Sequence, residues 1–110
     1  MEISEQKIDN KTILSLKGRL DASSAKELKD KVSDLAKEGN TFLVVDMGHA
    51  DFIDSSGLGS LVSCLRSVSR LGGDIRICSL KDSVRAVFEL TRLHLIFEIF
   101  DNSDDALKSI

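Results

Sequence analysis

The chain has 110 residues, of which 42% are apolar and 30% are charged, and this balance indicates a folded globular protein rather than a disordered one. Its length suits one domain, which we expect to span residues 1–110. Eighteen acidic and 15 basic residues give a formal net charge of −3, which argues against nucleic acid or an anionic membrane as the main partner. We therefore expect the partner to be a protein or a small molecule.

Two cysteines and the absence of long apolar stretches bear on the compartment. Cys64 and Cys78 each lie within an apolar pattern, and no CxxC motif is present. This favours two core thiols in a reducing compartment over a metal or redox site. No stretch resembles a signal peptide or a membrane span. We expect a cytoplasmic protein without a resident metal or other cofactor.

The first elements form a predicted hairpin followed by a helix. Residues 2–8 and 12–17 read as two strands around the turn signal Asp9-Asn10-Lys11. We expect Gly18 to break the second strand and residues 19–22 to form a loop. Ser24 and Glu27 have the spacing of a capping box, which predicts a helix over residues 24–38. Its apolar face is expected to contain Leu28, Val32, Leu35 and Ala36.

The middle of the chain predicts a buried strand, a loop and a second helix. Residues 41–47 are nearly all apolar, as in a strand covered on both faces. Residues 48–53 are expected to be a loop. The helix is predicted over residues 56–71, with an apolar stripe three and four residues apart formed by Leu58, Leu61, Val62, Leu65, Val68 and Leu71.

The last third repeats the alternation of strand and helix. A strand is expected at 74–79, a helix at 83–91 capped by Asp82 or Ser83, a strand at 95–100 and a final helix opening at Ser103. We expect the third helix to turn Val84, Val87, Phe88 and Leu90 inward. The order β-β-α-β-α-β-α-β-α predicts an α/β fold whose strands are parallel after the hairpin. The small apolar content favours two layers with most helices on one face, and their polar outer faces favour a monomer.

The stretch Asp54-Ser55-Ser56-Gly57-Leu58-Gly59 joins the central strand to the second helix. Asp and Ser are common helix caps, so the stretch could be purely structural. However, two adjacent serines exceed what one cap needs. Gly57 and Gly59 each weaken a helix by roughly 1 kcal/mol relative to alanine. Two glycines are understandable if another backbone must approach closely.

Charge around this stretch points to a switch rather than to an anion pocket. Residues 40–65 contain no lysine or arginine but include Asp46, Asp51 and Asp54. A phosphate added to a serine would carry a charge of about −1.5 to −2 and would find helix N–H groups without a cationic partner. Such a charge would repel or displace a bound molecule. The residues alone do not separate Ser55 from Ser56 as the acceptor.

Other chemistries fit the sequence less well. Neither a GxGxxG nor a GxxxxGK[ST] motif is present, and the serines do not stand in a GxSxG elbow. His49 and His94 are the only histidines, and we interpret them as loop and surface residues. The spacing of the three aspartates does not match a calcium loop.

The segment Phe52-Ile53-Asp54-Ser55-Ser56-Gly57-Leu58-Gly59 resembles the signature of the STAS domain family, in particular the single-domain bacterial anti-sigma factor antagonists. Further likeness lies in Gly18-Arg19-Leu20-Asp21, in Gly72-Gly73 and in residues 87–93. The resemblance implies the STAS fold, with a mixed sheet of about five strands and about four helices. It also implies a regulatory binding protein without enzymatic activity.

The family's function implies roles for particular residues. Members bind an anti-sigma factor that is also a serine kinase, and so release a sigma factor. Carried over by position, Ser55 would be the phosphoacceptor, and a serine phosphatase would restore it. The residues in or beside the partner surface would be Asp21, Ser24, Asp54, Ser56, Gly57 and Leu58.

Two departures and two alternatives accompany this resemblance. Arg19 stands where the family is often acidic, which could change the kinase that is recognised, and Arg92 stands where it often has glycine. The chain could instead be a STAS subunit of a lipid-transport ATPase or of a stress-signalling scaffold that is never phosphorylated. A nucleotide-binding role has only the helix N-terminus at residues 55–57 in its favour.

Overall fold

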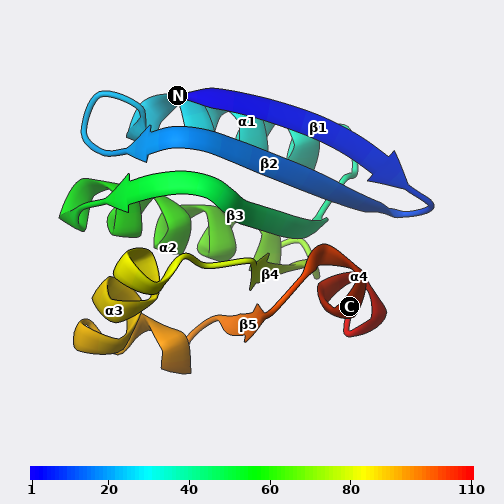
Figure 1. Cartoon of the computed structure of the whole chain (residues 1–110). Helices are drawn as coiled ribbons and strands as arrows, with labels where there is room; N and C mark the ends of the chain where they lie inside the picture. Colours follow the sequence, from blue (N-terminus) through cyan, green and yellow to red (C-terminus); the bar gives the residue numbers. More distant parts are fainter.

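The computed structural model describes all residues from 1 to 110 and contains a five-stranded sheet in the order β1-β2-β3-β4-β5 (Figure 1). β1 and β2 form an antiparallel hairpin, and each later strand joins the previous one in parallel. Ile8 pairs with Lys11, so the hairpin turn contains only Asp9 and Asn10. The strands are Glu2–Ile8, Lys11–Leu20, Phe42–Ile53, Asp74–Cys78 and Glu98–Phe100.

Four helices cover the sheet unevenly. They are α1 (Ala25–Lys37), α2 (Ser55–Ser69), α3 (Asp82–Leu90) and α4 (Ser103–Lys108), and a short 3-10 turn, η1, spans Leu93–Leu95. The buried residues of α1, α2 and α3 share one apolar cluster, whereas α4 belongs to a second cluster. Figure 1 shows α1 and α2 behind the sheet. The predicted α/β class, element order and placement of most helices on one face are confirmed.

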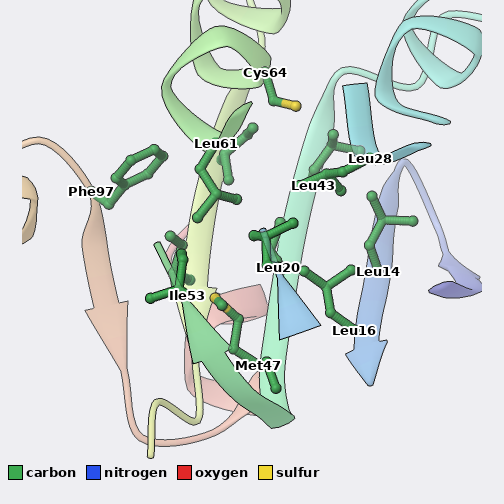
Figure 2. Packing of buried hydrophobic residues seen from close by; sticks show 14 of the residues in the cluster. Leu14, Leu16, Leu20, Leu28, Leu43, Met47, Ile53, Leu61, Cys64 and Phe97 are labelled. Carbon is green, nitrogen blue, oxygen red and sulfur yellow. The ribbon is translucent and has the colours of Figure 1, made fainter. Parts of the chain in front are cut away.

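The core follows from the alternation of side chains along the two central strands. Leu14 and Leu16 of β2 and Leu43 and Met47 of β3 belong to the cluster that includes α1 and α2 (Figure 2). The intervening Ile13 and Val44 lie in the smaller cluster with Ala106 of α4. Neighbouring apolar residues of these strands therefore face opposite sides of the sheet and pack against different helices.

The two thiols lie in different clusters. Cys64 is in the larger cluster and Cys78 in the smaller one, and both are free and buried, as predicted. Burial raises the pKa of the Cys64 thiol to about 12 and that of the Cys78 thiol to about 11. Both side chains act as small apolar groups at neutral pH.

The two central strands run further than the sequence predicted. β2 continues through Gly18 to Leu20, and β3 continues from residue 48 to Ile53, so the predicted loops at 19–20 and 48–53 are wrong. The strands pair with each other over this extension, with register shifts near Lys17 and Gly18. Ala50 and Ile53 are buried. Pairing and burial thus override the weak strand preference of this stretch.

Two predicted helix caps are also wrong. The Ser24 side chain does not cap α1; it donates a hydrogen bond to the carbonyl of Arg19 and accepts one from the N–H of Asp21. The residue that precedes α3 is Lys81, and no side chain caps that helix. Tertiary contacts to the end of β2 thus take the Ser24 hydroxyl that the capping box would have used.

The predicted strand at 95–100 is shortened to its last three residues. Arg92 adopts a left-handed conformation with φ of 61°, and the chain then forms η1 before β5 begins. Leu90 is 84% exposed, so the prediction that it points inward is wrong. Leu71 is 60% exposed because α2 ends at Ser69 and a turn follows. These apolar residues lie beyond the faces that pack on the sheet.

Candidate functional site

The end of β2 supports the turn that precedes α2. The N–H of Asp54 donates to the carbonyl of Leu20 at 3.3 Å. A Cβ atom on Gly57 would lie 2.1 Å from the same carbonyl oxygen and 2.9 Å from Cγ1 of Ile53. The backbone that Gly57 allows to approach therefore belongs to the chain itself. Gly59 is different, because it is exposed and a Cβ there would meet nothing within 4 Å.

Asp54 closes the N-terminus of α2 and leaves two N–H groups free. Its Oδ1 atom accepts from the N–H of Gly57 at 2.9 Å, and its carbonyl accepts from the N–H of Leu58 at 2.9 Å. The N–H groups of Ser55 and Ser56 make no hydrogen bond within the chain. Both serines are exposed. The hydroxyl of Ser55, the first residue of α2, is therefore accessible beside unpaired donors at the positive end of a helix.

The remaining residues predicted for the partner surface divide into exposed and buried ones. Ser24, Gly57 and Leu58 are buried, and the Ser24 hydroxyl is hydrogen-bonded to Arg19 and Asp21 at the end of β2. Asp21 keeps 22% of its side chain exposed. Hydrogen bonds from the hydroxyl and then the N–H of Ser23 lower the pKa of the Asp21 carboxyl. Asp21 and Asp54 are thus both partly exposed, and Asp54 directly precedes the two serines.

Arg19, which the sequence analysis named as a departure from the family, lies at the end of β2 and contacts Phe52 and Asp21. Its guanidinium lies 3.7 Å from the centre of the Phe52 ring, and its Nε atom is 3.4 Å from Oδ2 of Asp21. The parallel register brings Arg19 beside Phe52. Asp21, one of the residues predicted for the partner surface, therefore has a cation beside it. No local signal reveals the contact with Phe52, because it depends on β2 continuing past Gly18.

The other chemistries considered from the sequence are not assembled. His49 is exposed on β3 and makes no hydrogen bond with either serine, while Nδ1 of His94 lies 3.3 Å from the carbonyl of Phe88. No three His, Cys, Asp or Glu side chains lie close enough together to hold a metal ion. None of the helices has the length and apolar character needed to cross a membrane.

The fold and the serine-bearing turn define a small α/β domain that presents the N-terminus of its central helix. Residues 2–106 match the STAS domain family, and the chain belongs to that family. It is 27% identical to the anti-sigma-B factor antagonist of Bacillus subtilis over 100 residues, which cover 91% of each chain.

Solved structures share the whole fold. The TM1081 protein of Thermotoga maritima superposes with a TM-score of 0.92 at 28% identity, covering 98% of this chain and 93% of that one. The anti-sigma factor antagonist SpoIIAA is more distant in sequence, at 18% identity, with a TM-score of 0.75 over 98% of this chain and 96% of its own. A structure of SpoIIAA from Bacillus in its phosphorylated form matches equally well, with a TM-score of 0.76.

Proposed function

We propose that this chain is an anti-sigma factor antagonist that binds an anti-sigma factor and is released when Ser55 is phosphorylated. The observation that carries the proposal is the exposed hydroxyl of Ser55 at the first position of α2, in a turn fixed by Asp54 and Leu20. The relatedness to the B. subtilis anti-sigma-B factor antagonist supports the partner class. The kinase is the anti-sigma factor itself, and a serine phosphatase reverses the modification.

The physical basis of release is a charge added to a surface that a partner must cover. A phosphate on Ser55 brings about −1.5 to −2 charges beside the carboxylate of Asp54. In the free protein, water and the unpaired N–H groups can solvate it. In a complex that excludes water, the same group must lose much of that solvation, and any acidic partner group near it is repelled.

This switch needs no change in the fold. Ser55 is exposed, and the buried neighbours that hold the turn, Gly57 and Leu58, face the sheet. Phosphorylation therefore changes the surface and leaves the core packing unaltered. The protein acts by binding and release rather than by catalysing a reaction.

The test uses the purified chain and the anti-sigma factor of the serine-kinase class from the same organism. Incubation with ATP should add about 80 Da, one phosphoryl group, to the peptide that contains Ser55. Ser55→Ala should abolish this mass shift while the matched control Ser56→Ala retains it. Phosphate found on Ser56, or none on either serine, contradicts the assignment.

Binding provides the second arm of the test. Ser55→Asp should weaken the complex by at least about tenfold, because a fixed negative charge at the helix N-terminus takes the place of the phosphate. Ser55→Ala should bind as the unmodified chain does. A complex that tolerates both Ser55→Asp and phosphorylation would show that release has another cause.

A further inference from the structure

A groove lies between α3 and β5, and the Ser55 turn does not line it. It has a volume of about 510 Å³ and is lined by Arg85 and Glu89 of α3 and by residues 94–100, from η1 through β5. None of the residues assigned to the candidate partner surface lines it. β5 is the last strand of the sheet, so its outer edge has no strand beside it.

Exposed apolar side chains gather at this groove. The chain has four large apolar residues that are strongly exposed, and three of them, Leu90, Leu95 and Ile96, fall within seven residues of one another. Leu95 and Ile96 line the groove and are 70% and 54% exposed. Arg92, between α3 and these residues, adopts a positive φ that costs a non-glycine residue conformational energy. A strained loop that exposes apolar residues is characteristic of an interaction surface.

The charges of the groove are balanced in a way that fits a copy of the same surface. Arg85 and Glu89 stand one helical turn apart, yet neither makes an ion pair within the chain. Glu98 is already paired with Arg76, so Arg85 and Glu89 are the two charges of the groove that have no ion-pair partner within the chain. A strongly acidic or strongly basic partner would meet like charges here. A surface with equal numbers of opposite charges can be complementary to itself across a two-fold axis.

We infer that the groove between α3 and β5 takes a second copy of this chain. In such a dimer, a two-fold axis passes beside the middle of α3, so Arg85 of each copy faces Glu89 of the other. Leu95 and Ile96 of each copy become buried in the partner's groove. This state differs from the monomer that the polar helix faces predicted. It leaves both Ser55 turns accessible, and it does not depend on the proposed function.

Sedimentation equilibrium of the full chain tests the inference from about 10 μM to about 1 mM. The wild type should pass from monomer to dimer within this range. Arg85→Glu and Glu89→Arg should each weaken association by at least about tenfold, because each places like charges opposite one another. The double variant R85E/E89R should return to within about threefold of the wild type, since the exchanged pair is again complementary.

A second pair of variants separates apolar contact from charge. Ile96→Asp should abolish the dimer, whereas Leu71→Asp, at an equally exposed apolar residue outside the groove, should leave it intact. Circular dichroism confirms that each variant is folded. A wild type that stays monomeric throughout the range overturns the inference. So does a dimer that persists in Ile96→Asp or that the exchanged double variant fails to restore.

Discussion

Gly57 provides the strictest test of how the serine-bearing turn is held. Substitution by alanine places a methyl group 2.1 Å from the carbonyl oxygen of Leu20, whereas ordinary contact begins at 3.4 Å. That oxygen cannot retreat freely, because it accepts the hydrogen bond from Asp54. Overpacking against backbone costs about 3 kcal/mol, at the upper end of the usual range, and alanine's better helix propensity recovers roughly 1 kcal/mol. We expect Gly57→Ala to lower the free energy of unfolding by about 2 kcal/mol.

Gly59→Ala is the matched control, in the same helix and two residues away. Its Cβ meets no atom within 4 Å, so only helix propensity changes, and the variant should be more stable by roughly 0.5–1 kcal/mol. Urea unfolding followed by circular dichroism measures both values, since the chain has no tryptophan or tyrosine for fluorescence. If Gly57→Ala were as stable as Gly59→Ala, the close approach of β2 to α2 would be refuted.

Four further predictions concern stability and the reactivity of the two thiols. Thr12→Val should raise the free energy of unfolding in urea by about 1 kcal/mol, because the Thr12 hydroxyl is buried without a hydrogen-bond partner. A loss of stability would mean that this hydroxyl does have a partner. Arg92→Gly should raise the free energy of unfolding by about 0.5–1 kcal/mol in the same assay, since glycine adopts a positive φ without strain. An unchanged or lower value would mean that the Arg92 side chain makes compensating contacts. The thiols of Cys64 and Cys78 should react with a disulfide reagent at pH 8 far more slowly in the native chain than in urea. Burial raises the pKa of both thiols above the ordinary 9.0, so the native state favours their protonated forms. The free energy of unfolding should therefore decline as the pH rises from about 9 through 11 and 12. Equal native and denatured reactivity would contradict the burial.

The parts of the fold that could be predicted from the sequence are those with a strong local pattern. The helical stripes of α1 and α2 and the apolar run of β3 depend on periodicity within one element, and the structure contains all three. The extensions of β2 to Leu20 and β3 to Ile53 depend on pairing between strands far apart in the chain. Gly18 and Gly48 read locally as breaks, so no local rule could find these extensions.

The candidate site shows the same division. The cap formed by Asp54 and the exposure of Ser55 could be predicted from the order of residues around the helix start. The reason for Gly57 could not, because the carbonyl that requires it belongs to Leu20 on another strand. The position of Arg19 over Phe52 could not be predicted for a related reason, since it follows only from the parallel register.

The sequential order of the strands has a consequence for how the chain is made. Each strand of the sheet lies next to the one synthesised just before it, and none must be inserted between two that have already paired. A nascent chain can therefore add strands at one growing edge, with the hairpin as the starting point and β5 as the last addition. Chains stalled on the ribosome after β4 has emerged should already protect the amides of β2 and β3 from hydrogen exchange. Protection that arises only on release of the complete chain would mean that the sheet forms in a single late step.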